Sequence, residues 1–225
     1  MTPWHLAIET SGRHGSLALL RGDRLEQEIE LTAEQRTAAS LFPAMERLLQ
    51  PVRTGGSTLG LVSVSIGPGS FTGLRIGATV AKTLAYATKC SLVAVDTLEL
   101  IARQAWDAAP AIQQVLVGMK AYRGQVFARH CDRRRPEEAR SVVWPADQWQ
   151  QQVARLPAGC GLAGDAAGLP DLEISSEIIL VDAQAWRPTA ATLGRLAAAR
   201  TPVDPLKLVP NYLRPSAAEE KRLAT

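Results

Sequence analysis

The stretch SIGPGSFTGLRIG, residues 65–77, places glycines and a proline between a predicted strand, 61–66, and a predicted long helix, 74–89. Such a loop invites comparison with phosphate-binding motifs. A P-loop requires G-x-x-x-x-G-K-[ST], and a dinucleotide fingerprint requires G-x-G-x-x-G. Gly67, Gly69 and Gly73 fit neither spacing. We expect Ser70 or Thr72 to cap the helix, and the glycines to serve turns and close backbone approach.

The predicted helix carries a ridge of small residues. Gly73, Gly77, Ala81 and Ala85 recur every four positions and therefore share one side of the helix. Another backbone can come very close to such a side. The pattern leaves two alternatives open: the ridge packs inside its own domain, or it docks a further helix, which is either helix 37–50 or a partner protein.

The order of elements repeats along the chain. The first half is predicted to hold strands at 5–9, 15–20, 25–31, 61–66 and 92–95, with helices at 37–50, 74–89 and 97–107. The second half is predicted to hold strands at 115–119, 124–129, 141–144, 160–165 and 178–181, with helices at 147–155 and 189–200. We therefore expect a duplicated α/β architecture with a domain at 1–109, a domain at 110–213 and a polar tail at 214–225. From Pro202 onward the chain is expected to cross the surface and fray.

Composition limits the classes of function. The chain has 225 residues, 46% hydrophobic and 21% charged, which is typical of a folded soluble protein. A formal net charge of +3 without a basic stripe is a weak nucleic-acid signature. Cys90, Cys131 and Cys160 show no C-x-x-C spacing and are expected to be reduced thiols. With no signal peptide and no long apolar run, we expect a cytoplasmic protein that does not span a membrane.

Several motifs together resemble one bacterial family. GPGSFTGLRIG at 67–77, LAIETS at 6–11, YRGQVF at 122–127 and P-N-Y-L-R at 210–214 are similar, in matching order, to the TsaB (YeaZ) family. This resemblance implies a duplicated actin-like fold of the ASKHA, ribonuclease H-like type. It also implies a non-catalytic partner of TsaD, acting with TsaE, in threonylcarbamoyl transfer to the tRNA adenine next to the anticodon. It further implies a homodimer when the protein is alone, and contact with tRNA only indirectly, through the complex.

In that family the long helices of the first domain make the contact with TsaD or with a second copy of the chain. Together with the small ridge, this gives the following candidate interface residues: Leu41, Met45, Gly73, Arg75, Gly77, Ala81, Lys82 and Ala85. Many relatives carry a histidine before the first helix, where this chain has Arg36 and Thr37.

The resemblance also raises the question of nucleotide binding and metal. The actin-like superfamily holds metal-bound phosphates with carboxylates in two hairpins; here these positions are Glu9 and Lys120. An ammonium group repels a cation, so magnesium-dependent hydrolysis by this chain alone is not expected. Neither His5, His14 nor His130 forms the H-x-x-x-H metal motif of TsaD-like enzymes, so no metal is expected. No cofactor is expected beyond weak ATP or ADP binding, with the following candidate residues: Thr10, Ser11, Gly12, Lys120, Arg123, Gly161 and Gly164.

Three hypotheses remain at this stage. The favoured one is a pseudo-enzyme subunit that docks on TsaD. The alternative is an ATP-binding actin-like ATPase or kinase that acts on its own, which Thr10, Ser11 and Gly12 and the glycines at 161–168 suggest. The third is a homodimeric binding module with no part in tRNA chemistry.

Overall fold

A computed structural model describes residues 2–31, 37–55, 58–170 and 172–214. The chain forms two compact units, the first comprising residues 1–100 and 188–211 and the second residues 101–187 and 212–225. The boundary between them falls within α4 (Thr97–Ala108). Each unit is built around a five-stranded mixed sheet.

The first sheet has the order β3-β2-β1-β4-β5. Its strands are β1 (Trp4–Glu9), β2 (Ser16–Arg21), β3 (Arg24–Glu30), β4 (Leu59–Ser65) and β5 (Ser91–Val95). The first three strands pair antiparallel, and β4 and β5 continue the sheet in parallel on the other side of β1. The hairpin and the half-exposed third strand are confirmed.

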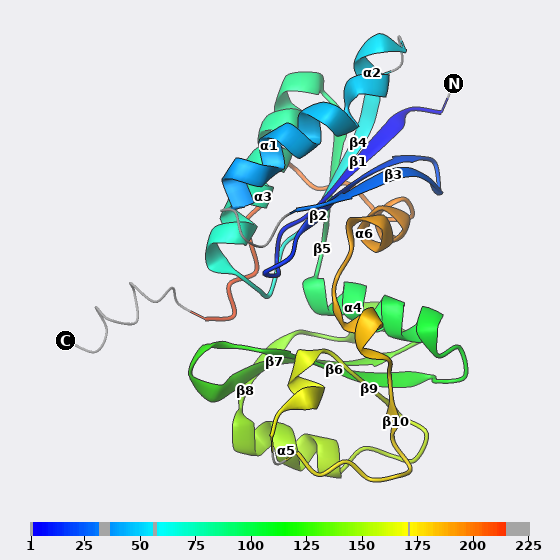
Figure 1. Cartoon of the computed structure of the whole chain (residues 1–225), viewed down its shortest axis with the longest axis vertical. Coiled ribbons are helices and arrows are strands. Elements are labelled where there is room, and N and C mark those ends of the chain that lie inside the picture. Colours follow the sequence, from blue (N-terminus) through cyan, green and yellow to red (C-terminus); the bar gives the residue numbers. More distant parts are fainter. Residues whose placement is uncertain (1, 32–36, 56–57, 171, 215–225) are drawn as a thin grey trace, which may run out of the picture. The chain divides into compact units, whose positions relative to one another are not determined.

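Helices cover both faces of this sheet (Figure 1). On one face lie α1 (Thr37–Leu48) and α3 (Phe71–Thr88), whose apolar residues join one core with the alternate positions Leu6 and Ile8 of β1. On the other face lies α6 (Ala190–Ala197), which packs on Ala7 of the same strand. Successive side chains of β1 therefore contribute alternately to two hydrophobic cores, one on each face of the sheet. The short helix α2 (Gln50–Thr54) follows α1.

The second sheet repeats the first. It contains β6 (Gln114–Lys120), β7 (Gln125–Asp132), β8 (Val142–Pro145), β9 (Gly161–Ala163) and β10 (Ile179–Leu180), in the order β8-β7-β6-β9-β10. As in the first sheet, three strands pair antiparallel and two follow in parallel. The helix α5 (Ala146–Ala154) covers one face with the fully buried Trp149. The duplicated actin-like fold is confirmed.

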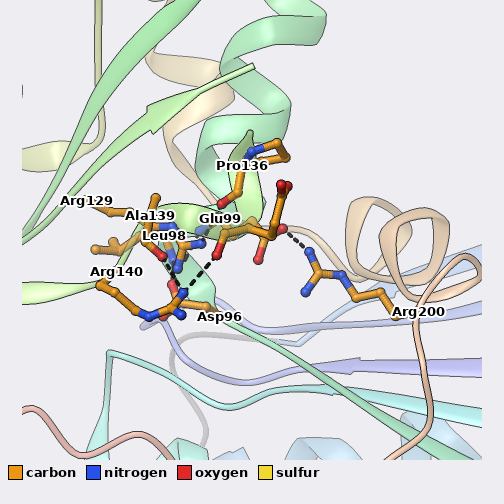
Figure 2. Close-up of polar contacts among 9 residues, drawn as sticks. Asp96, Leu98, Glu99, Arg129, Pro136, Ala139, Arg140 and Arg200 are labelled. Carbon is orange, nitrogen blue, oxygen red and sulfur yellow. Dashed lines mark hydrogen bonds and ion pairs between the residues drawn. The ribbon is translucent and has the colours of Figure 1, made fainter. Parts of the chain in front are cut away.

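The extent of the domains differs from the expected 1–109 and 110–213. The reason is α6, whose apolar side packs on the first sheet although it lies near the end of the chain. Just beyond α6, Arg200 pairs with Glu99 Oε1 at the start of α4 (Figure 2).

The segment after Pro202 is more ordered than the expected frayed tail. Val203 N donates to Leu92 O at 2.8 Å, and Lys82 Nζ donates to Leu208 O at 3.0 Å. Leu208 is buried, and Asn211 N bonds to Ile66 O at 2.6 Å. Backbone and side-chain bonds therefore attach this segment to the first unit as far as residue 211. The polar tail expected at 214–225 lies, beyond Arg214, outside the described residues.

The structure also bears on two further expectations, which concern membrane-spanning helices and the cysteines. In the described ranges, no helix is both long and apolar enough to cross a lipid bilayer. None of the three cysteines forms a disulfide bond; Cys131 and Cys160 are buried and Cys90 is half-buried. Burial raises the pKa of the Cys160 thiol, which disfavours the reactive thiolate.

His5 is a buried titratable group in the first sheet. Its Nε2 lies 2.8 Å from Ser63 Oγ on the neighbouring strand β4. Desolvation by burial lowers the pKa of His5 from 6.5 to about 4. The unfolded chain therefore takes up this proton at a higher pH than the folded chain, and folding becomes less favourable as the pH falls from 6.5 toward 4.

We expect His5→Gln to reduce the loss of stability between pH 7 and pH 4 by roughly 3 kcal/mol, because glutamine keeps a polar partner for Ser63 but does not titrate. Urea unfolding of both proteins at pH 7, 5.5 and 4 measures this difference. The matched control is His14→Gln, at an exposed histidine. An unchanged pH dependence in His5→Gln would contradict the assignment.

Candidate functional site

Glu9, at the end of β1, holds the loop that follows it. Its side chain is fully buried, and Oε1 accepts hydrogen bonds from Ser11 N at 2.8 Å, from Ser65 Oγ at 3.0 Å and from Ser11 Oγ. Thr10 is also buried and donates from Oγ1 to Gly73 O at 2.9 Å. The Glu9 carboxylate and the hydroxyl groups of Thr10 and Ser11 are thus all hydrogen-bonded to other groups of the first unit.

The glycines of α3 allow this loop to lie against the helix. A Cβ atom at Gly73 would be 2.0 Å from Thr10 O, and one at Gly77 would be 2.3 Å from Thr10 Oγ1. A Cβ at Gly69 would be 2.3 Å from Ser11 O. These distances are far below van der Waals contact. The close neighbour that the glycines admit is therefore the loop after β1, not another helix.

The start of α3 is capped by its own chain. Ser70 is the N-cap residue, and its Oγ accepts a hydrogen bond from Gly73 N at 3.2 Å. Ser70 N in turn donates to Ser11 O at 2.7 Å. The expected cap is confirmed, and it satisfies a donor that a bound anion would otherwise use.

The small ridge of α3 is buried in the first unit. Gly73, Gly77, Ala81 and Ala85 are all buried, and Leu41 of α1 is fully buried in the same core. The expectation that this ridge is free to dock a partner is therefore wrong, because the sheet and the loop after β1 already cover it. The alternative, packing inside the first domain, is confirmed.

The other candidate interface residues lie further out. Arg75 is exposed, and Met45 and Lys82 are half-buried. The sequence analysis did not select Phe42 of α1, which is 52% exposed, or Tyr86 of α3, which is 67% exposed. The available signal was an aromatic residue on the polar side of each amphipathic helix. Thr37 begins α1, but Arg36 lies outside the described residues.

The second unit brings together the remaining nucleotide candidates. Lys120 and Arg123 are exposed in the β6–β7 hairpin, and Lys120 N donates to Asp165 Oδ1 at 2.7 Å. Gly164 has φ +93°, and a Cβ there would be 2.1 Å from Gly118 O. Gly161 is buried, and its Cβ would be 2.6 Å from Ile112 Cδ1. Packing within the unit therefore accounts for both glycines.

The candidate nucleotide residues Thr10, Ser11 and Gly12 belong to the first unit, where Gly12 is half-buried. Nucleotide binding stays a prediction. Across the described part of the chain, no three His, Cys, Asp or Glu side chains are grouped so that they could hold a metal ion.

Comparisons with known proteins point to one family. The model of the TsaD family, tRNA N6-adenosine threonylcarbamoyltransferase, matches residues 30–135. The tRNA threonylcarbamoyladenosine biosynthesis protein TsaB of Bacillus subtilis is 35% identical over 122 residues, which cover 54% of this chain and 52% of that protein. TsaB of Escherichia coli is 29% identical over 192 residues, which cover 82% and 81%. The chain thus spans about half the length of the first relative and most of the second.

Solved structures agree on the fold. The crystal structure of a Pseudomonas aeruginosa protein described as similar to the peptidase YeaZ has 24% sequence identity and a TM-score of 0.73, and the match covers 94% of this chain and 100% of that one. A structure of YeaZ from the same organism has 24% identity, the same coverage and a TM-score of 0.68.

The tight contact at Gly73 can be tested by adding one methyl group. We expect Gly73→Ala to lower the free energy of unfolding by about 3 kcal/mol, since the backbone of Thr10 must move to admit the Cβ atom. Thr79→Ala, at an exposed position of the same helix, is the control and should change stability by no more than about 0.5 kcal/mol. Urea unfolding at pH 7 measures both. Equal stability of the two variants would show that the contact is looser than described.

Proposed function

This chain belongs to the TsaB (YeaZ) family, and we propose that it takes part in the biosynthesis of threonylcarbamoyladenosine in tRNA as a non-catalytic partner of TsaD, acting with TsaE. On this proposal the chain supplies a docking surface and leaves the transfer of the threonylcarbamoyl group to TsaD. Without its partner it forms a homodimer through the same surface.

The observation that carries the proposal is the outer side of the helix pair α1 and α3. Both helices cover one face of the first sheet (Figure 1), and each exposes a large aromatic side chain, Phe42 at 52% and Tyr86 at 67%. Lys89 Nζ lies 4.3 Å from the centre of the Tyr86 ring. Exposed aromatic rings with basic neighbours are typical anchors of protein interfaces. Because the small ridge is buried, this outer side replaces it as the proposed docking face.

The residues at the two hairpin positions where the actin-like superfamily carries carboxylates, Glu9 and Lys120, support a non-catalytic role. Glu9 is fully buried and accepts three hydrogen bonds from its own unit, an arrangement suited to holding a loop. The corresponding position of the second hairpin is the exposed Lys120. Metal-assisted phosphoryl transfer needs carboxylates that reach a cation, and this pair is poorly suited to that task.

We expect Phe42→Asp and Tyr86→Asp each to weaken association with TsaD of the same organism about 30-fold or more, because a carboxylate would be buried against an apolar surface. Size-exclusion chromatography with light scattering, on the chain alone and mixed with TsaD, measures both self-association and complex formation. Gln150→Asp, on the exposed side of α5, adds the same charge elsewhere and is the control. Wild-type affinity in both aromatic variants would exclude this docking face.

The two other hypotheses have their own tests. An ATPase or kinase that acts alone should show a rise in melting temperature with millimolar ATP and Mg²⁺, and an ATPase should also release phosphate. If neither occurs, that hypothesis is excluded. A binding module with no part in tRNA chemistry should leave the modified adenine unchanged when its gene is deleted, whereas the proposed function predicts its loss.

A further inference from the structure

The strand β10 forms an edge of the second sheet and exposes two large apolar side chains. In the part of the chain that the structure describes, β9 is the one strand beside it. Ile179 and Leu180 are 39% and 52% exposed, whereas Ile178 and Val181 on either side of them are buried. Apolar side chains on an exposed edge strand favour pairing with a further chain.

The backbone of β10 also leaves hydrogen-bonding groups on its outer side. Ile179 N donates to Cys160 O, next to β9, at 2.9 Å. Two residues further on, Val181 N donates to Leu162 O at 3.0 Å. Because successive residues of a strand direct their N–H and C=O groups to opposite sides, those of Leu180 point away from β9. They lie where an added strand would form its hydrogen bonds.

The chain around β10 is acidic. Between Arg155 and Arg187 the sequence has no lysine, arginine or histidine, although the whole chain has a net charge of +3. The acidic residues of this stretch are Asp165, Asp171, Glu173, Glu177 and Asp182.

Three of these carboxylates lie close to β10 in the sequence and are exposed. Glu177 and Asp182 flank the strand, and Glu173 precedes it. Within the described ranges, neither Glu173 nor Glu177 forms an ion pair. The apolar edge is therefore bordered by negative charge that no ion pair offsets.

From this arrangement we propose that β10 binds an extended, basic segment of a partner protein, which adds as a strand to the edge of the second sheet. Backbone groups of the segment bond to Leu180, its apolar side chains cover Ile179 and Leu180, and its lysines or arginines meet Glu177 and Asp182. A second copy of the chain would bring like carboxylates together, so the charge favours a basic partner over self-pairing.

This site consists of second-unit residues, whereas the proposed docking face belongs to the first unit. The test therefore uses the full chain without TsaD, and its outcome is independent of that docking. The probe is a fluorescein-labelled octapeptide in which lysine and valine alternate, and binding is followed by anisotropy at 50 and 300 mM salt. We expect a Kd below about 1 mM at 50 mM salt and weaker binding at 300 mM. An octapeptide of alternating glutamate and valine, which has the same apolar residues and the opposite charge, should not bind.

Leu180→Pro tests the backbone contact. Proline removes the outward N–H group and leaves both bonds to β9 in place, and edge strands tolerate proline where the N–H faces outward. We expect peptide binding to weaken at least 10-fold while the circular dichroism spectrum stays unchanged.

A second variant tests charge without altering the backbone. Glu177→Gln combined with Asp182→Asn removes both flanking charges, and asparagine keeps the oxygen that accepts a hydrogen bond from Gln184 N. This double variant should weaken binding at least fivefold at 50 mM salt. The control is Glu137→Gln, at an exposed carboxylate elsewhere in the second unit, which should stay within twofold of the wild-type affinity.

Three results would overturn the proposal. The first is that the lysine–valine peptide does not bind at millimolar concentration, because the carboxylates would then only prevent association at the edge. The second is that Glu137→Gln loses as much affinity as the double variant, which would indicate diffuse charge. The third is a homodimer, measured by light scattering, that Leu180→Pro dissociates, because the occupant of the edge would then be a second copy of the chain.

Discussion

The contact between α3 and the loop after β1 is the constraint on which the first unit depends. The loop lies so close to the helix that no side chain fits at Gly73 or Gly77, and the hydroxyl of Thr10 donates to the helix backbone. Glu9 fixes the other end of the loop from a fully buried position. Once this side of α3 is committed to its own unit, only the outer side remains for contacts with other proteins.

The second unit makes a corresponding contact next to its first strand, but with different hydrogen-bonding groups. In both halves, the chain at or just after the end of the first strand is attached to the segment that follows the fourth strand. In the first half the bond runs from Ser70 N to Ser11 O, and in the second it runs from Lys120 N to Asp165 Oδ1. Duplication has therefore kept the topology, while the residue at the end of the first strand differs: Glu9 is buried and Lys120 is exposed. Glu9 and Lys120 therefore do not form a symmetric pair of carboxylates that could bind a metal ion.

Positive charge is distributed by the fold rather than by the sequence. Along the chain the arginines look scattered, and the one basic run, 133–135, is followed at once by Glu137 and Glu138. In the folded second unit, Arg123 and Arg214 both lie near the Tyr122 ring and line one cavity with the start of α5. A fold can thus bring together charged residues that are far apart in the sequence.

The sequence by itself determined the type and order of the elements, because alternation and the helical period are local properties of the chain. It also excluded the phosphate-binding motifs at 65–77, because these require fixed spacings. Periodicity shows which residues share a side of a helix, but not what that side meets. Only the tertiary structure therefore decided that the small ridge faces the sheet and that Phe42 and Tyr86 are exposed. It likewise decided that α6 belongs to the first unit and that Arg214 reaches Tyr122, because pairings between distant segments arise only when the whole chain packs.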